Sequence, residues 1–136
     1  MSSADSLIRV SDYAVETLQK RLAEIADRRA ALEMRLVMLD AEREAETENA
    51  RRDAEAGWYH VGFLQGWRMR RAAVEADLNA VDLEEQGARD ALAHAFEELK
   101  KYEQVAAAQR LVKAKARAKR EDAQMDELGL RMAAAR

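Results

Sequence analysis

Few side chains in this sequence could take part in catalysis or hold a metal ion. It has two histidines, His60 and His94, no cysteine, and serines only within the first eleven residues. A nucleophilic serine needs a base held beside it, and the two histidines lack the spacing of metal ligands. The clustered glycines are not followed by the lysine and serine or threonine of a phosphate-binding loop. We therefore expect no enzyme activity, no metal and no cofactor.

The stretch GWYHVGFLQGW, residues 57–67, gathers the side chains that are most typical of a binding surface. It holds both tryptophans and three of the five glycines, in a chain with 5% aromatic residues. Exposed aromatic side chains often mark a partner-binding surface, whereas a buried cluster would only staple a turn. We expect both roles here, with Trp67 packed between helices and Phe63 or Trp58 facing outward. The candidate patch consists of Trp58, Tyr59, Phe63 and Trp67.

A second candidate surface is basic. Residues 110–120, RLVKAKARAKR, hold six cations and no acid. Such a run suits nucleic acid, an acidic protein or simply solvent. It has no aromatic side chain for base stacking, and acids return at Glu121 and Asp122. We therefore expect a protein with an acidic cavity as the partner rather than nucleic acid, with a solvated charged face as the alternative.

The composition predicts long helices rather than a globular core. Charged residues make up 36% of the 136 residues, and there is no proline. Ala, Glu, Arg and Leu dominate, as they do in coiled coils. The first residues lack the basic and apolar segments of a signal peptide, and no apolar run approaches the roughly 18 residues that span a bilayer. We expect a soluble, intracellular, all-α protein without disulfides.

Two stretches repeat apolar residues at the three- and four-residue spacing of a coiled-coil seam. The first seam fades into residues 40–56, which have seven acids and no side chain larger than alanine to bury. The second thins beyond Tyr102, before a short apolar face returns near the C-terminus at Met125, Leu128 and Met132. The first seam consists of Val15, Leu18, Leu22, Ile25, Arg29, Leu32, Leu36 and Leu39. The second consists of Trp67, Arg71, Val74, Leu78, Val81, Glu85, Ala88, Leu92, Ala95, Leu99 and Tyr102.

Three clustered glycines, at 57, 62 and 66, predict a break between two helices. We expect helix one at about 6–55, a turn at about 56–62 and helix two at about 63–134, folded back as an antiparallel hairpin in a single coiled-coil domain, 1–136. Helix two would outrun helix one from about residue 113. The polar seam residues would find opposite charges across the pair: Arg71 near Glu48 or Asn49, Glu85 near Arg35, and Arg29 near Asp90. The alternative is a dimer of one continuous helix.

The C-terminal stretch AKREDAQMDELGLRMAAAR resembles the end of FliJ, the small coiled-coil component of the bacterial flagellar type III export apparatus. In that family a basic helical stretch is followed by Gln, then by Asp-Glu, an apolar residue and an Arg. The segment YHVGFLQGW is similar to the family's aromatic, Phe-apolar-Gln start of the second helix, through Tyr59, Phe63, Leu64 and Gln65. The residues that fit the C-terminal pattern are Gln124, Met125, Asp126, Glu127, Leu128 and Arg131.

The resemblance implies an antiparallel two-helix coiled coil similar to the central stalk subunit of rotary ATPases. Its terminal ends would enter the hexameric ring of the export ATPase and promote ring assembly and activity. The region near the turn would meet the cytoplasmic side of the membrane export gate, and family members also handle empty export chaperones. The protein would thus be cytoplasmic, peripherally associated with the membrane at the flagellar base, with no nucleic-acid or small-molecule ligand.

Two surfaces of the protein are expected to bind partners. The aromatic patch would bind the gate, mostly through helix two, because residues 40–56 carry Glu42, Glu44 and Glu46 where some members place aromatics. The ATPase would bind the end of helix two, through Lys113, Lys115, Arg117, Lys119, Arg120, Met125, Asp126, Glu127, Leu128 and Arg131. Two alternatives stay open: a stalk protein of the related virulence secretion systems, and a self-associating structural coiled coil with no ATPase partner.

Overall fold

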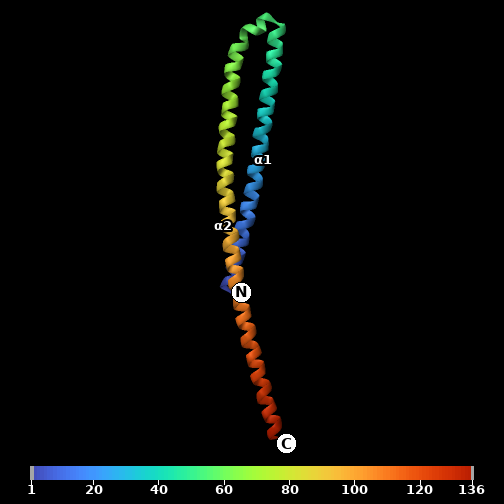
Figure 1. The fold of residues 1–136 in the computed structure, drawn as a ribbon, viewed down its shortest axis with the longest axis vertical. Helices are drawn as coiled ribbons and strands as arrows, with labels where there is room; N and C mark the ends of the chain where they lie inside the picture. The colour runs from blue at the N-terminus through green and yellow to red at the C-terminus, as the bar shows by residue number, and fades with distance from the viewer. Residues whose placement is uncertain (1, 136) are drawn as a thin grey trace. The chain divides into compact units, whose positions relative to one another are not determined.

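The computed structural model describes residues 2–135, which form two α-helices and no strand, α1 (Ser3–Arg52) and α2 (Ala54–Ala134) (Figure 1). The chain divides into two compact units. The tip unit, Glu16–Ala93, contains the reversal of the chain, and the terminal unit combines Met1–Val15 with His94–Arg136. With 50 residues in α1 and 81 in α2, the expected all-α hairpin with a longer second helix is confirmed.

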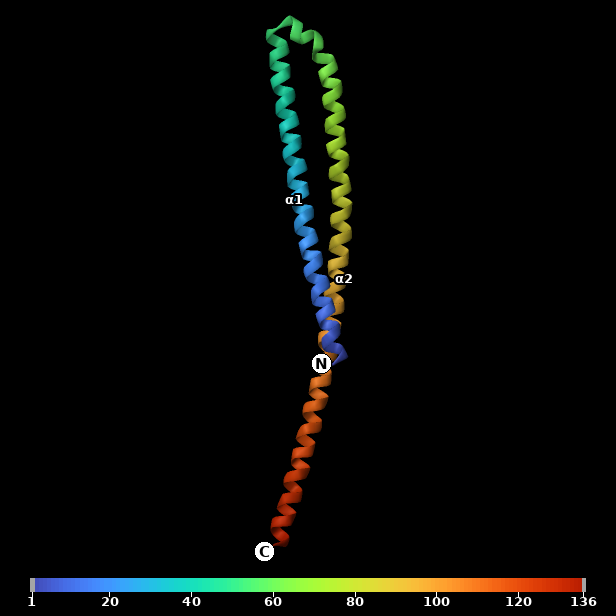
Figure 2. The ribbon, with the colours of Figure 1, turned by 180° about the vertical axis from the view of Figure 1, so that it is seen from behind.

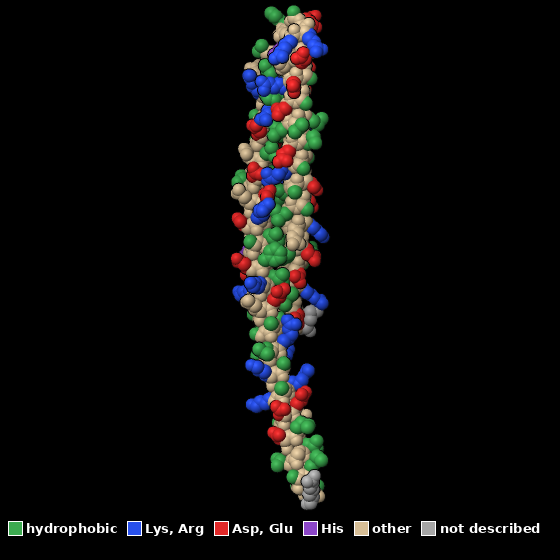
Figure 3. Space-filling view, turned by 45° about the vertical axis from the view of Figure 1, so that its right-hand side comes forward, with side chains coloured by type: hydrophobic (Ala, Val, Ile, Leu, Met, Phe, Trp, Pro, Cys, Tyr) green, Lys and Arg blue, Asp and Glu red, His purple; other side chains and the backbone are tan. Residues whose placement is uncertain are grey.

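In the tip unit α1 and α2 run antiparallel and side by side, as the two opposite views agree (Figures 1 and 2). Every seam position predicted within this unit is buried or half-buried. Burial of one aliphatic side chain contributes about 1.5–3 kcal/mol, so a single stripe of them is enough to join the helices. Charged side chains flank this stripe on the face drawn in Figure 3. The buried residues form two clusters, Ile25 with Val81 and Ala88, and Leu39 with Trp67 and Val74.

In the terminal unit the first residues of α1 lie beside α2. Ser2 caps α1: its hydroxyl accepts a hydrogen bond from the backbone N–H of Asp5 (3.2 Å), and its own backbone N–H donates to the Asp5 carboxylate (3.3 Å). This reciprocal arrangement is a capping box, and the hydrogen bonds from the hydroxyl and backbone N–H of Ser2 lower the pKa of Asp5. The buried side chains of this unit are Ala4, Ser11, Val15, Ala95 and Ala106.

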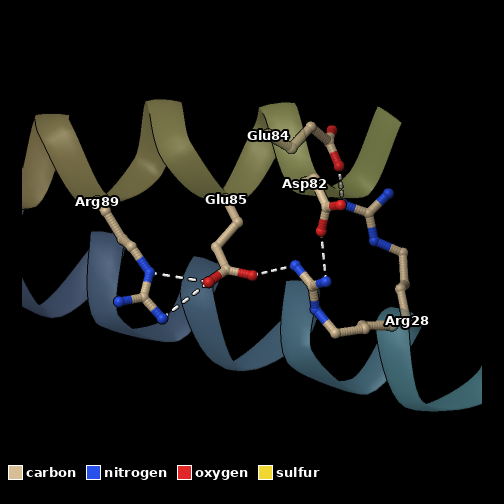
Figure 4. Close-up of polar contacts among 6 residues, drawn as sticks. Arg28, Asp82, Glu84, Glu85 and Arg89 are labelled. Atoms are coloured by element: carbon tan, nitrogen blue, oxygen red, sulfur yellow. Dashed lines mark hydrogen bonds and ion pairs between the residues drawn. The ribbon is translucent and has the colours of Figure 1, made fainter. Parts of the chain in front are cut away.

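The two polar residues of the central seam are partners of each other. Arg29 of α1 donates hydrogen bonds to Asp82 and Glu85 of α2. Figure 4 shows the Glu85 carboxylate reaching both Arg89 of its own helix, whose Nε lies 2.8 Å away, and a guanidinium of α1. The hydrogen bond from Arg29 holds the pKa of Glu85 below its usual value. The expectation that polar seam residues meet opposite charges therefore holds.

The identities of these partners differ from the prediction. Arg29 contacts Asp82 and Glu85 rather than Asp90, and Arg71 donates from Nε to Asp40 at 3.0 Å rather than lying beside Glu48. Each partner is displaced by about one to two helical turns. The cause is the position of the chain reversal, because moving a turn by a few residues shifts every opposed pair by twice that number.

The break between the helices lies at Asp53, not at 56–62, and helix one therefore ends at Arg52 rather than near 55. The Asp53 carboxylate accepts a hydrogen bond from the backbone N–H of Glu55 at 3.0 Å, which makes it the N-cap of α2. Arg51 and Arg52 end α1, where cations favour the helix dipole, and both pair with Glu48. Local capping chemistry therefore sets this boundary.

The clustered glycines lie inside α2. Neither these nor any other described glycine has a positive φ. At Gly57 an added Cβ would lie 3.3 Å from the backbone oxygen of Ala50 on α1, whereas at Gly62 and Gly66 it would meet no atom within 4 Å. Gly57 thus permits the close approach of the two helices just after the reversal, which is a packing role rather than a helix-breaking one.

The capping role of Asp53 predicts the effect of two substitutions. Asp53→Ala removes the side-chain acceptor and should lower the free energy of unfolding by about 1 kcal/mol. Asp53→Asn keeps an acceptor oxygen, so its free energy of unfolding should stay close to that of the parent. Urea unfolding followed by helical circular dichroism measures both, and equal losses in the two variants would contradict the capping hydrogen bond.

The Arg29–Glu85 contact predicts a charge-reversal cycle. Arg29→Glu places a third acid beside Asp82 and Glu85 and should lower the thermal midpoint, and adding Glu85→Arg should restore much of the loss. Arg35→Glu, at an exposed position of α1, is the control with the same change in net charge and should have little effect. If the double variant is less stable than Arg29→Glu alone, the contact does not contribute as described.

Candidate functional site

The aromatic patch expected near the turn is divided between the inside and the outside of the tip unit. Trp67 is 6% exposed and lies in the cluster with Leu39 and Val74. Its indole N–H donates to the backbone oxygen of Leu39 at 2.6 Å, which fixes the ring against α1. The prediction that Trp67 packs between the helices is confirmed.

Phe63 also faces inward. It is partly buried against the Leu39–Trp67–Val74 cluster, and the ring of His60 stacks on it with centroids 6.2 Å apart and an interplanar angle of 19°. The Nδ1 atom of His60 is buried without a hydrogen-bond partner. Phe63 and His60 therefore extend the apolar contact between α1 and α2 toward the chain reversal.

Trp58 and Tyr59 face outward instead. Their exposed fractions are 82% and 68%, and Val61 next to them is 74% exposed. All three lie in the first two turns of α2, directly after the N-cap at Asp53. Of the four predicted patch residues, the structure thus leaves two available to a partner and uses two to join the helices.

Sequence reasoning missed a groove beside Trp67. Arg43 of α1 stacks over the indole ring, 4.7 Å from its centroid, and Arg71 of α2 lies 5.9 Å from it. The hydrogen bond to Asp40 raises the pKa of Arg71, so this guanidinium stays charged beside the ring. The sequence signal that could have indicated this groove was Arg43, an arginine in the acid-rich end of helix one. The open groove, of about 750 Å³, is lined by Asp40, Arg43, Glu44, Thr47, Glu48, Arg51, Trp67 and Arg71.

The basic candidate surface lies in the terminal unit on the part of α2 that α1 does not cover. Ser2, which precedes α1, and Asp5 of α1 border a hollow together with Gln109, Arg110 and Lys113. After Ala106 every described residue of α2 is exposed. The free segment therefore includes the basic run from Lys113 onward, close to the limit of about 113 expected from the sequence.

The remaining predicted residues of this end are exposed side chains of one helix. Met125, Leu128 and Met132 are 67%, 51% and 62% exposed. Glu127 and Arg131 form an ion pair at 2.9 Å along the helix. On the face drawn in Figure 3, the end that carries the C-terminus shows cations first, then acids, then hydrophobic side chains. All ten residues assigned to this end thus share one uncovered helix, which we call the tail (residues 107–135).

The part of the chain that the structure describes contains no cluster of metal-binding side chains. No three His, Asp or Glu side chains there are grouped as a metal ion requires. His94 is exposed on α2, and His60 lies in the tip unit against Phe63. Within residues 2–135, no helix combines the length and the apolar character needed to cross a membrane.

Comparison with known proteins identifies relatives along almost the whole chain. No protein-family model matches it, and no solved structure does. Two proteins named flagellar FliJ protein, from Caulobacter vibrioides strains NA1000 and ATCC 19089, are each 55% identical to this chain over 131 residues. The matched region covers 96% of this chain and 94% of each relative. Such identity over nearly the whole length of both chains, together with the C-terminal pattern and the helical hairpin, shows that the chain belongs to the flagellar FliJ family.

Proposed function

We propose that this chain, a flagellar export component by its family, is the non-enzymatic central stalk of the type III export apparatus. In this proposal its tail enters the hexameric export ATPase and promotes ring assembly and activity. The tip unit contacts the membrane export gate from the cytoplasmic side. The protein is then cytoplasmic and peripherally associated with the membrane at the flagellar base, where it also handles empty export chaperones.

The observation that carries this proposal is the uncovered, cationic tail. Six cations within residues 110–120 repel one another along one helix, and like charges four residues apart are destabilising. Lys113 and Arg117 form such a pair, as do Lys115 and Lys119. An acidic channel would offset this repulsion, and the exposed Met125, Leu128 and Met132 would add apolar contact deeper in such a channel.

The exposed aromatics of the tip unit support the second contact. Trp58 is 82% exposed, whereas the second tryptophan of the chain, Trp67, is almost completely buried. Large aromatic side chains supply much of the affinity of protein interfaces. Trp58, Tyr59 and Val61 form an exposed apolar surface near the chain reversal. This surface suits a partner at that end of the tip unit.

A stalk fits the molecule better than a structural coiled coil held together by self-association of the whole hairpin. Each seam of the tip unit is already covered by the other helix of the same chain. A second copy has no seam left to occupy there. Both relatives are flagellar proteins by name, which favours the flagellar system over the virulence systems.

The ATPase contact predicts a salt-sensitive loss of function upon charge reversal. Lys115→Glu, Arg117→Glu and Lys119→Glu together should remove most of the stimulation of the export ATPase, because they replace attraction by repulsion. The hairpin should remain folded, since all three side chains are exposed. ATP hydrolysis at low salt is the measurement, and stimulation by the parent should fall steeply with salt, because exposed charges are screened over about 10 Å at 0.1 M.

The matched control changes the same net charge elsewhere. Lys20→Glu, Lys100→Glu and Lys101→Glu together alter three exposed cations outside the tail and should leave stimulation near the parent level. If the tail variant stimulates the ATPase as well as this control does, the tail is not the contact.

The gate contact predicts that gate binding and folding stability depend on different residues of the tip unit. Trp58→Ala with Tyr59→Ala should abolish binding to the cytoplasmic part of the gate while leaving the unfolding midpoint unchanged, because both side chains are exposed. Phe63→Ala should instead lower the free energy of unfolding, by about 1–3 kcal/mol for a partly buried ring. Calorimetric titration and urea unfolding measure the two effects, and gate binding that survives the double substitution would remove this surface from the proposal.

A further inference from the structure

The tail carries a second apolar stripe that the hairpin does not use. Its residues follow the four- and three-residue spacing of a coiled coil, with Glu121 as the one polar position. It lies on a different face of α2 from the seam that ends at Tyr102 and Ala106, about 100° or more around the helix axis. The stripe consists of Ala107, Leu111, Ala114, Ala118, Glu121, Met125, Leu128 and Met132.

No described part of the chain covers this stripe. Leu111 is 56% exposed and Leu128 is 51% exposed, and the methionines between and after them are exposed further. The stripe is longer than the short C-terminal face recognised in the sequence, because Leu111, Ala114 and Ala118 extend it back through the basic run. A sustained exposed stripe at this spacing is the surface that a partner helix covers in a coiled coil.

The charges of the tail are arranged in two blocks along its length. Lys113, Lys115, Arg117, Lys119 and Arg120 form the basic block, and Glu121, Asp122, Asp126 and Glu127 form an acidic block directly after it. Two such helices in parallel would place cations against cations. In an antiparallel pair, most of the basic block of each helix faces the acidic block of the other, and only Lys119 and Arg120 at its end face cations.

We propose that the tail pairs with the tail of a second copy of this chain as an antiparallel two-stranded coiled coil. The spacing selects the register. Leu111 faces Leu128 of the second copy, Ala114 faces its Met125, and Ala118 faces its Glu121. Each small residue thereby meets a longer one, as close packing requires.

One flanking charge pair agrees with the same register, whereas Arg110 and Arg131 meet as like charges at its ends. Lys115 and Asp122 occupy equivalent flanking positions beside the stripe, and the antiparallel alignment sets Lys115 of each copy against Asp122 of the other. The arrangement has two-fold symmetry, so every contact occurs twice and the assembly closes at two copies rather than growing into a filament. It uses the same tail as the proposed ATPase contact, so one excludes the other.

The test is sedimentation velocity of the full chain over a concentration series. The parent should show a reversible monomer–dimer equilibrium. Leu128→Asp, on the stripe, should weaken dimerisation at least about tenfold, because it removes an apolar contact on both copies and adds charge. Leu130→Asp is the matched control, since Leu130 is a leucine of the same tail at 73% exposure but lies off the stripe. It should dimerise like the parent.

Two outcomes of this experiment overturn the proposal. A parent that stays monomeric at every concentration has no such interface, and equal losses in the two leucine variants mean that association does not use the stripe. Because sedimentation needs no ATPase, failure here leaves the stalk proposal standing, and failure of ATPase stimulation leaves this one standing.

Disulfide formation tests the direction of the two tails. The chain has no cysteine, so single cysteines can be introduced cleanly. A mixture of Ala114→Cys and Met125→Cys chains should form a linked dimer upon oxidation, because the antiparallel register sets these positions opposite each other. Neither variant alone should link, since its two cysteines lie about 16 Å apart along the pair. Linkage within either variant alone contradicts the antiparallel arrangement.

Discussion

A pair of helices can cover only one stripe of side chains on each partner, and the tip unit depends on this constraint. There is no third layer to enclose a core, so every residue of the stripe must be apolar or carry its own partner. Arg29 and Glu85 satisfy the rule by pairing with each other, with Asp82 and Arg89 completing the network. Removal of one member leaves a half-buried charge facing apolar neighbours, which costs more than the pair contributes.

The seams could be predicted from spacing because burial on a helix pair follows the 3.5-residue repeat directly. The position of the chain reversal could not be predicted from composition. The three clustered glycines suggested a break among themselves, whereas a single aspartate, Asp53, caps the second helix. Two signals were available. The sequence Arg51-Arg52-Asp53 places cations at a helix end and an N-cap residue directly after it. In addition, the spacing of the second seam continues backward from Trp67, and the half-buried Leu64 and His60 occupy it.

The division of the aromatic patch has the same origin. Once helical geometry continues through Gly57 and Gly62, each residue turns about 100° around the axis of α2. Phe63 and Trp67, four residues apart, fall on the face toward α1, and Trp58 and Tyr59 fall outside it. Had these residues formed a turn, their side chains could have pointed in any direction. Arg43 could not be assigned in this way, because its contact with Trp67 depends on a register that the reversal alone determines.

The helix of the tail is stabilised differently from the helices of the tip unit. Most helices in proteins are held by packing of one face, yet no described residue after Ala106 is covered. Its helix rests on the high intrinsic propensity of Ala, Lys, Arg, Glu and Leu, opposed by repulsion within the basic block and by Gly129. Any helix or cavity that covers the apolar stripe and supplies acids beside Lys115 and Arg117 therefore stabilises the helix itself as well as the contact. The seam of the tip unit is covered within one chain, whereas the tail gains its packing only through association.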